Sequence, residues 1–173
     1  MLAAVRNSDS IGAITLLNEE LRNDREIAFE AVKHDASCLA YINERFRDDI
    51  EIVLEAVKNK GVSLKYASDR LKNDEDIVYK AVKENSFALS DASDSLKDDK
   101  KFLLKIIKIM HSPPNLGSFS KRVQKDKDVV FEVYKRTIEL LKKAHLNTHH
   151  MFIYKKPLIT ALCFFEEDNK VIE

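Results

Sequence analysis

Glycine, proline and cysteine are scarce in this chain of 173 residues, and tryptophan is absent. Three glycines and three prolines are too few for the frequent turns of a β-sandwich or barrel, so the composition favours helices. Two cysteines, Cys38 and Cys163, are too few for a disulfide scaffold and form no Cys-x-x-Cys pair, which fits a reducing compartment. No run approaches the roughly 20 apolar residues of a membrane span, and the N-terminus lacks the layout of a signal peptide. We therefore expect a soluble protein without a membrane span.

Net charge is also lacking, because 29 Lys and Arg balance 29 Asp and Glu. The charges are unevenly distributed, however. Residues 1–95 hold 13 basic and 19 acidic side chains, a net of −6, whereas residues 96–143 hold 13 and 6, a net of +7. Such a dipole steers charged partners and makes their binding depend on salt, but it does not identify them.

A 25-residue pattern recurs along the chain. Four apolar residues mark its period, and an aspartate follows each of them three residues later: Leu21, Phe46, Leu71 and Leu96, then Asp24, Asp49, Asp74 and Asp99. A fifth unit begins at Val123 after two extra residues, and the chain opens inside a truncated unit. Units of this length, each with two helices, predict an all-α protein built as an α-solenoid.

The repeat also predicts the domain organisation. We expect a helical repeat array over residues 1–136 and a C-terminal segment over residues 137–173. The array is divided into units near residues 1–20, 21–45, 46–70, 71–95, 96–122 and from 123 onward. Residues 137–173 are expected to hold the end of a long helix, a loop and a capping helix that covers the last exposed face, as terminal units of solenoids do.

The first helix of each unit has a recognisable start and an apolar face. Asn23 or Asp24 is suited to the N-cap, and Asn23 with Glu26 has capping-box spacing. Ile27, Ala28, Ala31 and Val32 follow as a buried stripe.

The second helix is predicted over about Ser37–Phe46, Val62–Leu71 and Phe87–Leu96, with a narrower apolar stripe. Between the two helices, Gly61 is suited to a left-handed backbone.

The C-terminal third departs from this pattern. The fourth unit carries Met110-His111-Ser112-Pro113-Pro114-Asn115 between its helices, and its second helix is predicted at Asn115–Val123. A long helix is expected to reach about Ala144, followed by a loop at His145–His150. A final apolar helix is predicted at Pro157–Glu167, and a strand at Met151–Tyr154 remains an alternative for the segment before it.

A family resemblance rests on two of these units. The first stretch consists of Leu71-Lys72-Asn73-Asp74-Glu75-Asp76-Ile77-Val78-Tyr79-Lys80-Ala81-Val82-Lys83, followed by Leu89 and Ala92-Ser93-Asp94. It resembles the repeats of the domain of unknown function 4116 family. The segment Phe46–Asp69 does too, with Gly61 at the family's glycine position. The resemblance implies a helical repeat and no enzymatic activity. Some carriers of such repeats look like proteins delivered into host cells, so we expect a cytoplasmic location, in the source cell or in a host cell.

The residue types that perform chemistry do not form a recognisable site. The repeated aspartates, Asp48-Asp49 and Asp98-Asp99 among them, are interpreted as helix caps, and Cys38 as a small packing residue, because its equivalents are Ser63 and Ala88. His145, His149 and His150 with Cys163 are the one candidate for zinc or catalysis, but they lack ligand spacing. Phosphate-binding and nucleophile motifs are absent. We therefore expect no enzyme, no cofactor and no metal.

Two surfaces remain as candidate binding sites. Tyr41 and Tyr66, one repeat apart, with Arg45 and Arg70, predict an aromatic and basic surface suited to a protein partner. The function expected first is accordingly a non-enzymatic protein-interaction module, alone or within a larger multidomain or secreted effector-like protein.

The alternative function is a binder of RNA or acidic lipid through the basic segment 97–127. Its candidate residues are Lys100, Lys101, Lys105 and Lys108. Nucleic acid is the less expected partner, because equivalent exposed positions vary from unit to unit and no base-reading code is visible.

Overall fold

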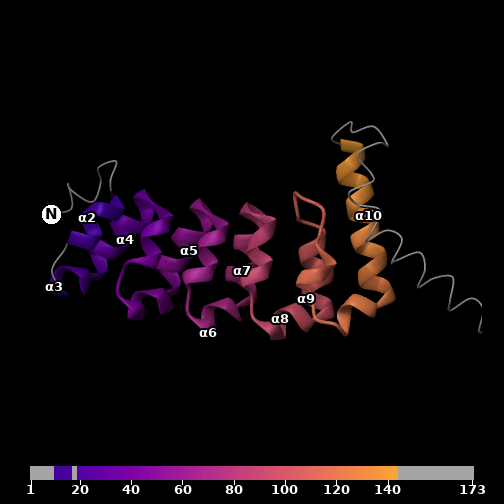
Figure 1. The fold of residues 1–173 in the computed structure, drawn as a ribbon, viewed down its shortest axis with the longest axis horizontal. Coiled ribbons are helices and arrows are strands. Elements are labelled where there is room, and N and C mark those ends of the chain that lie inside the picture. The colour runs from indigo at the N-terminus through magenta and orange to yellow at the C-terminus, as the bar shows by residue number, and fades with distance from the viewer. Residues whose placement is uncertain (1–9, 17–18, 144–173) are drawn as a thin grey trace, which may run out of the picture. The chain divides into compact units, whose positions relative to one another are not determined.

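The computed structural model describes residues 10–16 and 19–143, and all regular secondary structure within these residues is helical (Figure 1). The predicted all-α class is therefore confirmed. The chain divides into two compact units, Met1–Lys97 and Asp98–Glu173.

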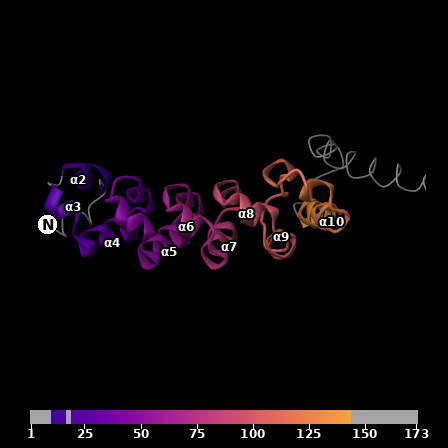
Figure 2. The same ribbon diagram turned by 90° about the horizontal axis from the view of Figure 1, so that it is seen from below.

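The first unit is built from two layers of short helices. The first layer contains α4 (Arg25–His34), α5 (Ile50–Asn59) and α7 (Glu75–Glu84), which lie side by side and begin 25 residues apart. The 3₁₀ helices η1 (Ala36–Ala40), η3 (Gly61–Tyr66) and η4 (Ser86–Asp91) pack against them as the second layer (Figure 2). The remaining described elements are α2 (Ser10–Leu16), α3 (Glu19–Arg22), η2 (Glu44–Asp48), α6 (Asp69–Lys72) and α8 (Asp94–Asp98).

Aspartate N-caps start the helices of the first layer. Asp24 Oδ1 accepts from the backbone N–H groups of Glu26 and Ile27 at 2.8 and 3.1 Å, and Asp49 and Asp74 do the same for α5 and α7. The cap satisfies amides that have no partner inside the helix. Of the two residues considered for the cap, Asp24 is correct. The capping box of Asn23 with Glu26 is wrong, because the third residue after Asp24 is Ile27, which has no side chain that can accept a hydrogen bond.

The predicted second helices are wrong as continuous elements, because each is interrupted near its middle. In the first case η1 ends at Ala40 and η2 begins at Glu44. The residue before each second piece is a capping type whose side chain accepts from a later N–H: Asn43 from Arg45, Ser68 from Leu71 and Ser93 from Leu96. Short polar side chains compete with helical hydrogen bonds in this way, so the chain turns there and a second piece starts.

The core lies between the two layers of the first unit. In α5 the buried side chains are those of Ile52, Val53, Ala56 and Val57, and α4 and α7 bury the four equivalent positions. The second layer contributes Cys38, Leu39, Leu64, Ala88 and Leu89, all at most 1% exposed. Helices of about ten residues are marginal alone in water, so this shared core is what stabilises them.

Gly61 is required for space and not for a left-handed backbone. Its φ lies outside the positive range in which glycine is favoured, so the prediction of a left-handed residue is wrong. A Cβ at this position would instead meet the backbone oxygen of Ala81 and lie 3.0 Å from the backbone nitrogen of Asn85. The Gly61 N–H donates to the carboxylate of Glu84, so the end of α7 closes directly over this residue.

The described part of the second unit contains two α-helices, α9 (Lys100–Ile107) and α10 (Lys127–Lys143), which pack together. Only the short 3₁₀ helices η5 (Leu116–Ser118) and η6 (Val123–Lys125) stand where one helix was predicted at Asn115–Val123. That prediction is wrong because Phe119 is extended between them and Ser120 caps the second piece, accepting from the Val123 N–H at 3.3 Å.

The long helix predicted to end near Ala144 corresponds to α10. The guanidinium of Arg136 on this helix donates to the Met110 carbonyl at 2.7 and 3.0 Å. The loop His145–His150, the alternative strand Met151–Tyr154 and the capping helix Pro157–Glu167 lie outside the described residues. Among the helices that the structure describes, none is long and apolar enough to cross a membrane.

Candidate interaction surface

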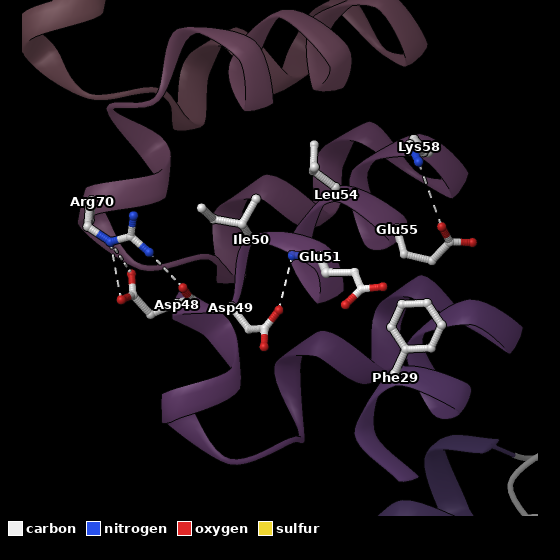
Figure 3. Close-up of a pocket in the computed structure, with 9 residues that line it drawn as sticks. All are labelled: Phe29, Asp48, Asp49, Ile50, Glu51, Leu54, Glu55, Lys58 and Arg70. Carbon is white, nitrogen blue, oxygen red and sulfur yellow. Dashed lines mark hydrogen bonds and ion pairs between the residues drawn. The ribbon is translucent and has the colours of Figure 1, made fainter. Parts of the chain in front are cut away.

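A shallow groove of about 560 Å³ opens on the first layer beside α5. We call it the α5 groove; it is lined by Phe29, Asp48, Asp49, Ile50, Glu51, Leu54, Glu55, Lys58 and Arg70 (Figure 3). Three of these side chains are apolar and come from two neighbouring helices, with Phe29 on α4 and both Ile50 and Leu54 on α5. The groove therefore combines an apolar floor with charged walls, the combination by which protein sites bury and orient a ligand.

Ile50 is the residue that sets this groove apart. It occupies the first position of α5, where α4 has Arg25 and α7 has Glu75, and its side chain is 48% exposed. The exposed part of this large aliphatic side chain contributes no burial of apolar area to the stability of the fold, whereas a partner that covered it would remove that area from water.

The apolar floor continues along the outer side of the first layer. Leu54 is half-buried on α5, and Phe29 and Tyr79 are half-buried at the equivalent positions of α4 and α7, each 25 residues away. The helices that carry them are neighbours in the layer. The three side chains thus form an apolar row, one residue per helix.

Acidic side chains stand beside this row, and Arg25 is the cation that holds two of them. Its guanidinium lies 2.7 Å from Asp49 Oδ2 and 2.6 Å from Glu51 Oε2. The hydrogen bond from Arg25, opposed by partial burial, lowers the pKa of Asp49, and the same pairs raise the pKa of Arg25. Glu55 faces Lys58 at 4.0 Å, too far for a hydrogen bond.

Arg70 closes the end of the groove through Asp48. Arg70 Nε lies 3.0 Å from Asp48 Oδ1, and Nη2 donates to the Asp48 carbonyl at 2.8 Å. The hydroxyl of Ser68 donates to the same carboxylate. The Ser68 bond, followed by the Arg70 bond, lowers the pKa of Asp48. This carboxylate is thus a fixed anion at neutral pH.

The two arginines predicted for a partner surface each contact a residue near the start of their own 25-residue unit. Arg45 donates to the Asn23 carbonyl as Arg70 does to that of Asp48, and the Arg45 guanidinium carbon also lies 4.5 Å from the centre of the Phe46 ring. Arg70 lines the α5 groove, whereas Arg45 is exposed but is not among the residues that line the groove. Both side chains therefore have a structural role that the sequence pattern did not reveal.

The two predicted tyrosines lie on the other layer. Tyr41 follows η1 and is 47% exposed, and Tyr66 ends η3 with the Nζ of Lys65 4.6 Å from its ring centre. The contact with Tyr66 is the main cause that raises the pKa of Lys65. At the third equivalent position, burial raises the pKa of Asp91, opposed by Lys72 and other nearby lysines. The structure thus separates the tyrosines from the α5 groove.

The predicted lysine patch is only partly available to a ligand. Lys100 Nζ lies 2.9 Å from Asp126 Oδ1 and 2.6 Å from Asp128 Oδ2, and these two carboxylates raise the pKa of Lys100. Lys101 and Lys105 are exposed on α9, and Lys108 is exposed at its C-cap.

The candidate chemical residues give no further site in the described ranges. Cys38 is buried in the core, in agreement with its interpretation as a packing residue. Within residues 10–16 and 19–143, no group of three or more His, Cys, Asp and Glu is arranged to hold a metal ion. His145, His149, His150 and Cys163 lie outside the described residues.

Sequence reasoning missed the α5 groove, although one signal for it is readable. When the helices are aligned at their first residues, Ile50 is equivalent to Arg25, Glu75, Lys100 and Lys127. It is therefore the one apolar residue at a position that is otherwise charged. Which face of the helix this position occupies, and which acids surround it, depends on the packing of neighbouring helices.

These features define an all-α protein whose first unit carries a charged groove with an apolar floor. Comparison with protein families identifies the class: the model of the Domain of unknown function (DUF4116) matches residues 1–47, 49–97 and 74–112. The chain belongs to this family, as the residues of the repeat suggested. No curated protein and no solved structure matches the chain.

Proposed function

We propose that the chain is a non-enzymatic helical-repeat module for protein–protein interaction, which binds a segment of a partner in the α5 groove. The observation that carries the proposal is the exposed Ile50 beside the half-buried Phe29 and Leu54, in a groove of about 560 Å³. Anchors of this kind, apolar at the centre and surrounded by charge, are typical of protein interfaces.

The proposal includes an α-solenoid of 25-residue two-helix repeats as the scaffold. Three first-layer helices start at Arg25, Ile50 and Glu75 with the same aspartate cap, which supports this architecture. A solenoid keeps its core constant and varies its surface, so a change at one exposed position, such as Ile50, creates a site without altering the fold. We further propose a cytoplasmic location for this chain, alone or as part of a secreted effector-like or larger multidomain protein.

Site-specific photo-crosslinking tests the proposed site. A benzophenone amino acid is placed at Ile50 and, as a matched control, at Glu75, the equivalent exposed position on α7. In an extract of the source cells, the Ile50 variant should give a discrete adduct that excess unlabelled protein removes, and the Glu75 variant should give little of it. Equal adducts from both positions, or none from Ile50, would reject the α5 groove as the binding site.

A second candidate function is supported by the exposed lysines on α9 and at its C-cap. Lys101, Lys105 and Lys108 follow i, i+4 and i+7 spacing and lie on one side of the helix. Such a row suits phosphate groups of RNA or acidic lipid. Binding of a short RNA or of phosphatidylserine vesicles at about 50 mM salt, lost in the Lys101→Glu/Lys105→Glu/Lys108→Glu variant, would support this function. Absence of binding at that salt concentration would reject it.

A further inference from the structure

We infer that the outer side of α4, α5 and α7 receives an amphipathic helix whose apolar residues recur every seven positions and whose flank beside Glu26, Glu51 and Asp76 carries Lys and Arg. This inference rests on the proposed function and specifies the class of partner. It uses the apolar row of Phe29, Leu54 and Tyr79 and the acids beside it.

The spacing of the apolar row favours a helical partner. Packed helices have axes about 8–10 Å apart, so equivalent side chains on α4, α5 and α7 repeat at about that distance across the layer. A helix rises about 1.5 Å per residue, so its residues i, i+7 and i+14 lie on one face about 10.5 Å apart. One partner residue can therefore meet each of Phe29, Leu54 and Tyr79 in turn.

An extended partner fits the row less well. Side chains on one face of a strand recur every two residues, at about 6.6 Å, or every four, at about 13 Å. Neither distance matches neighbouring helix axes, so an extended chain would place some of its side chains against the charged residues between the apolar contacts.

Charge determines the polar flanks of the partner. On the N-terminal side of the apolar row, three residues earlier in each helix, the chain has Glu26, Glu51 and Asp76, all exposed. The lining of the α5 groove contains four carboxylates against Lys58 and Arg70, and Arg25 pairs with two of the four, Asp49 and Glu51. The C-terminal side of the apolar row is basic, because Lys33, Lys58 and Lys83 are exposed four residues later in each helix.

The wider surroundings have the same sign as the acidic N-terminal side of the row, since residues 1–95 carry a net charge of −6. Lysine and arginine on the flank of the partner that faces Glu26, Glu51 and Asp76 are therefore attracted, whereas acidic side chains on that flank are repelled.

Three synthetic peptides test the inference on the full chain. The first is a fluorescein-labelled helix of about 18 residues with leucine at every seventh position and Lys and Arg beside each leucine. The second has Glu in place of Lys and Arg. A third has the composition of the first, with its leucines distributed around the helix. Fluorescence anisotropy should show saturable binding of the first peptide, at least about tenfold tighter than that of the second and third.

Variants of the protein locate the contact. Leu54→Lys should weaken binding of the basic peptide by at least about tenfold, and the Glu51→Lys/Glu55→Lys variant should reverse the preference toward the acidic peptide. Tyr66→Ser on the other layer is the matched control and should bind as the unmodified protein does. Circular dichroism melting of each variant shows that it is folded, so that loss of binding is not loss of structure.

Three outcomes overturn the inference. The acidic peptide binds as tightly as the basic peptide, the peptide with redistributed leucines binds as tightly as the basic peptide, or the folded Leu54→Lys variant binds the basic peptide as tightly as the unmodified protein does. If any of these is found while crosslinking from Ile50 still gives a specific adduct, the proposed function stands and only the class of partner is wrong. If crosslinking from Ile50 also fails, the site itself is wrong.

Discussion

Arg70 on α6 holds the end of the preceding short helix, η2, through both the side chain and the backbone of Asp48. Its Nε lies 3.0 and 3.2 Å from the two carboxylate oxygens, and its Nη2 donates to the Asp48 carbonyl at 2.8 Å. In the second unit, Arg122 makes the same set of contacts with Asp98, at 3.1, 3.1 and 2.6 Å. The recurrence indicates a standard link between successive short helices, in which the last residue of one helix accepts hydrogen bonds from an arginine at the start of the next.

Asp48→Asn should remove the pH dependence of this link while keeping its hydrogen bond. Asn73 stands at the equivalent position and accepts from Ser93 Oγ at 2.5 Å without a charge, so the amide is compatible with the site. Because Ser68 and Arg70 lower the pKa of Asp48 in the folded protein, its charge stabilises the fold above the unfolded pKa of about 3.9. That contribution is lost as the pH falls through the lower, folded pKa.

Thermal melts between about pH 2 and pH 7 measure this effect. Near neutral pH the variant should melt about 1–3 °C below the unmodified protein, a small change because the pair is exposed. In strong acid the two melting temperatures should converge. Asp98→Asn is an independent copy of the experiment. A difference that stays constant across the whole pH range would contradict the role assigned to the carboxylate.

Asp49 has two separable roles, as the N-cap of α5 and as the partner of Arg25. Asp49→Ala removes both and should lower the free energy of unfolding by about 0.5–2 kcal/mol for the cap, plus a smaller amount for the ion pair. Asp49→Asn keeps a capping oxygen and should lose only the smaller part. Urea unfolding followed by circular dichroism measures both variants.

Arg25→Ala provides the control for the ion pair. If the pair with Asp49 is the only difference between the aspartate and the asparagine, Asp49→Asn should have almost no effect in the Arg25→Ala background. Equal losses for Asp49→Ala and Asp49→Asn would show that the cap is not the main role of this residue.

The starts of the first-layer helices could be predicted from sequence because local chemistry decides them. Asp24, Asp49 and Asp74 satisfy amides only two and three residues away, and the apolar spacing of Ile52, Val53, Ala56 and Val57 follows from helix geometry alone. Neither depends on a distant part of the chain. The all-α class and the long helix α10 followed for the same reason.

The interrupted second layer and the α5 groove could not be predicted in this way. The sequence is compatible with Ser68 as a polar residue on the outer face of one helix or as the cap between two helices. Its hydrogen bond to Asp48, 20 residues earlier, favours the second arrangement. Likewise, Arg70 looked like an exposed anchor because its partner is 22 residues away. The exposure of Ile50 depends on how α4 and α5 pack, which the 25-residue period does not specify.

Cys38 should tolerate a smaller side chain better than a larger one. It is fully buried, and the equivalent positions Ser63 and Ala88 are also buried and small. Cys38→Ala should lower the free energy of unfolding by about 1 kcal/mol or less, whereas Cys38→Leu should lower it by about 1–3 kcal/mol because it overpacks the core. Chemical unfolding of the two variants decides this. A leucine variant as stable as the alanine variant would show that the layers have room between them.

Gly61→Ala should destabilise the protein, although the usual effect of this substitution at an ordinary backbone conformation is stabilising. Since φ at Gly61 is not positive, alanine would be allowed by the backbone and would reduce the entropy of the unfolded chain by an equivalent of about 0.4–1 kcal/mol. The added Cβ, however, meets the backbone oxygen of Ala81, which belongs to α7 and cannot move without shifting that helix. Overpacking of this kind costs about 1–3 kcal/mol, so a net loss is expected.

Gly117→Ala is the matched control, because its nearest neighbour would be the flexible side chain of Asn115, with Oδ1 at 3.2 Å. It should change the free energy of unfolding by less than about 0.5 kcal/mol. Urea titrations of both variants measure the contrast. Because Gly61 also donates to Glu84, the Gly61→Ala/Glu84→Ala variant should not recover stability, since the backbone contact with Ala81 remains. Recovery in that double variant would place the conflict at the Glu84 side chain and not at the backbone of α7.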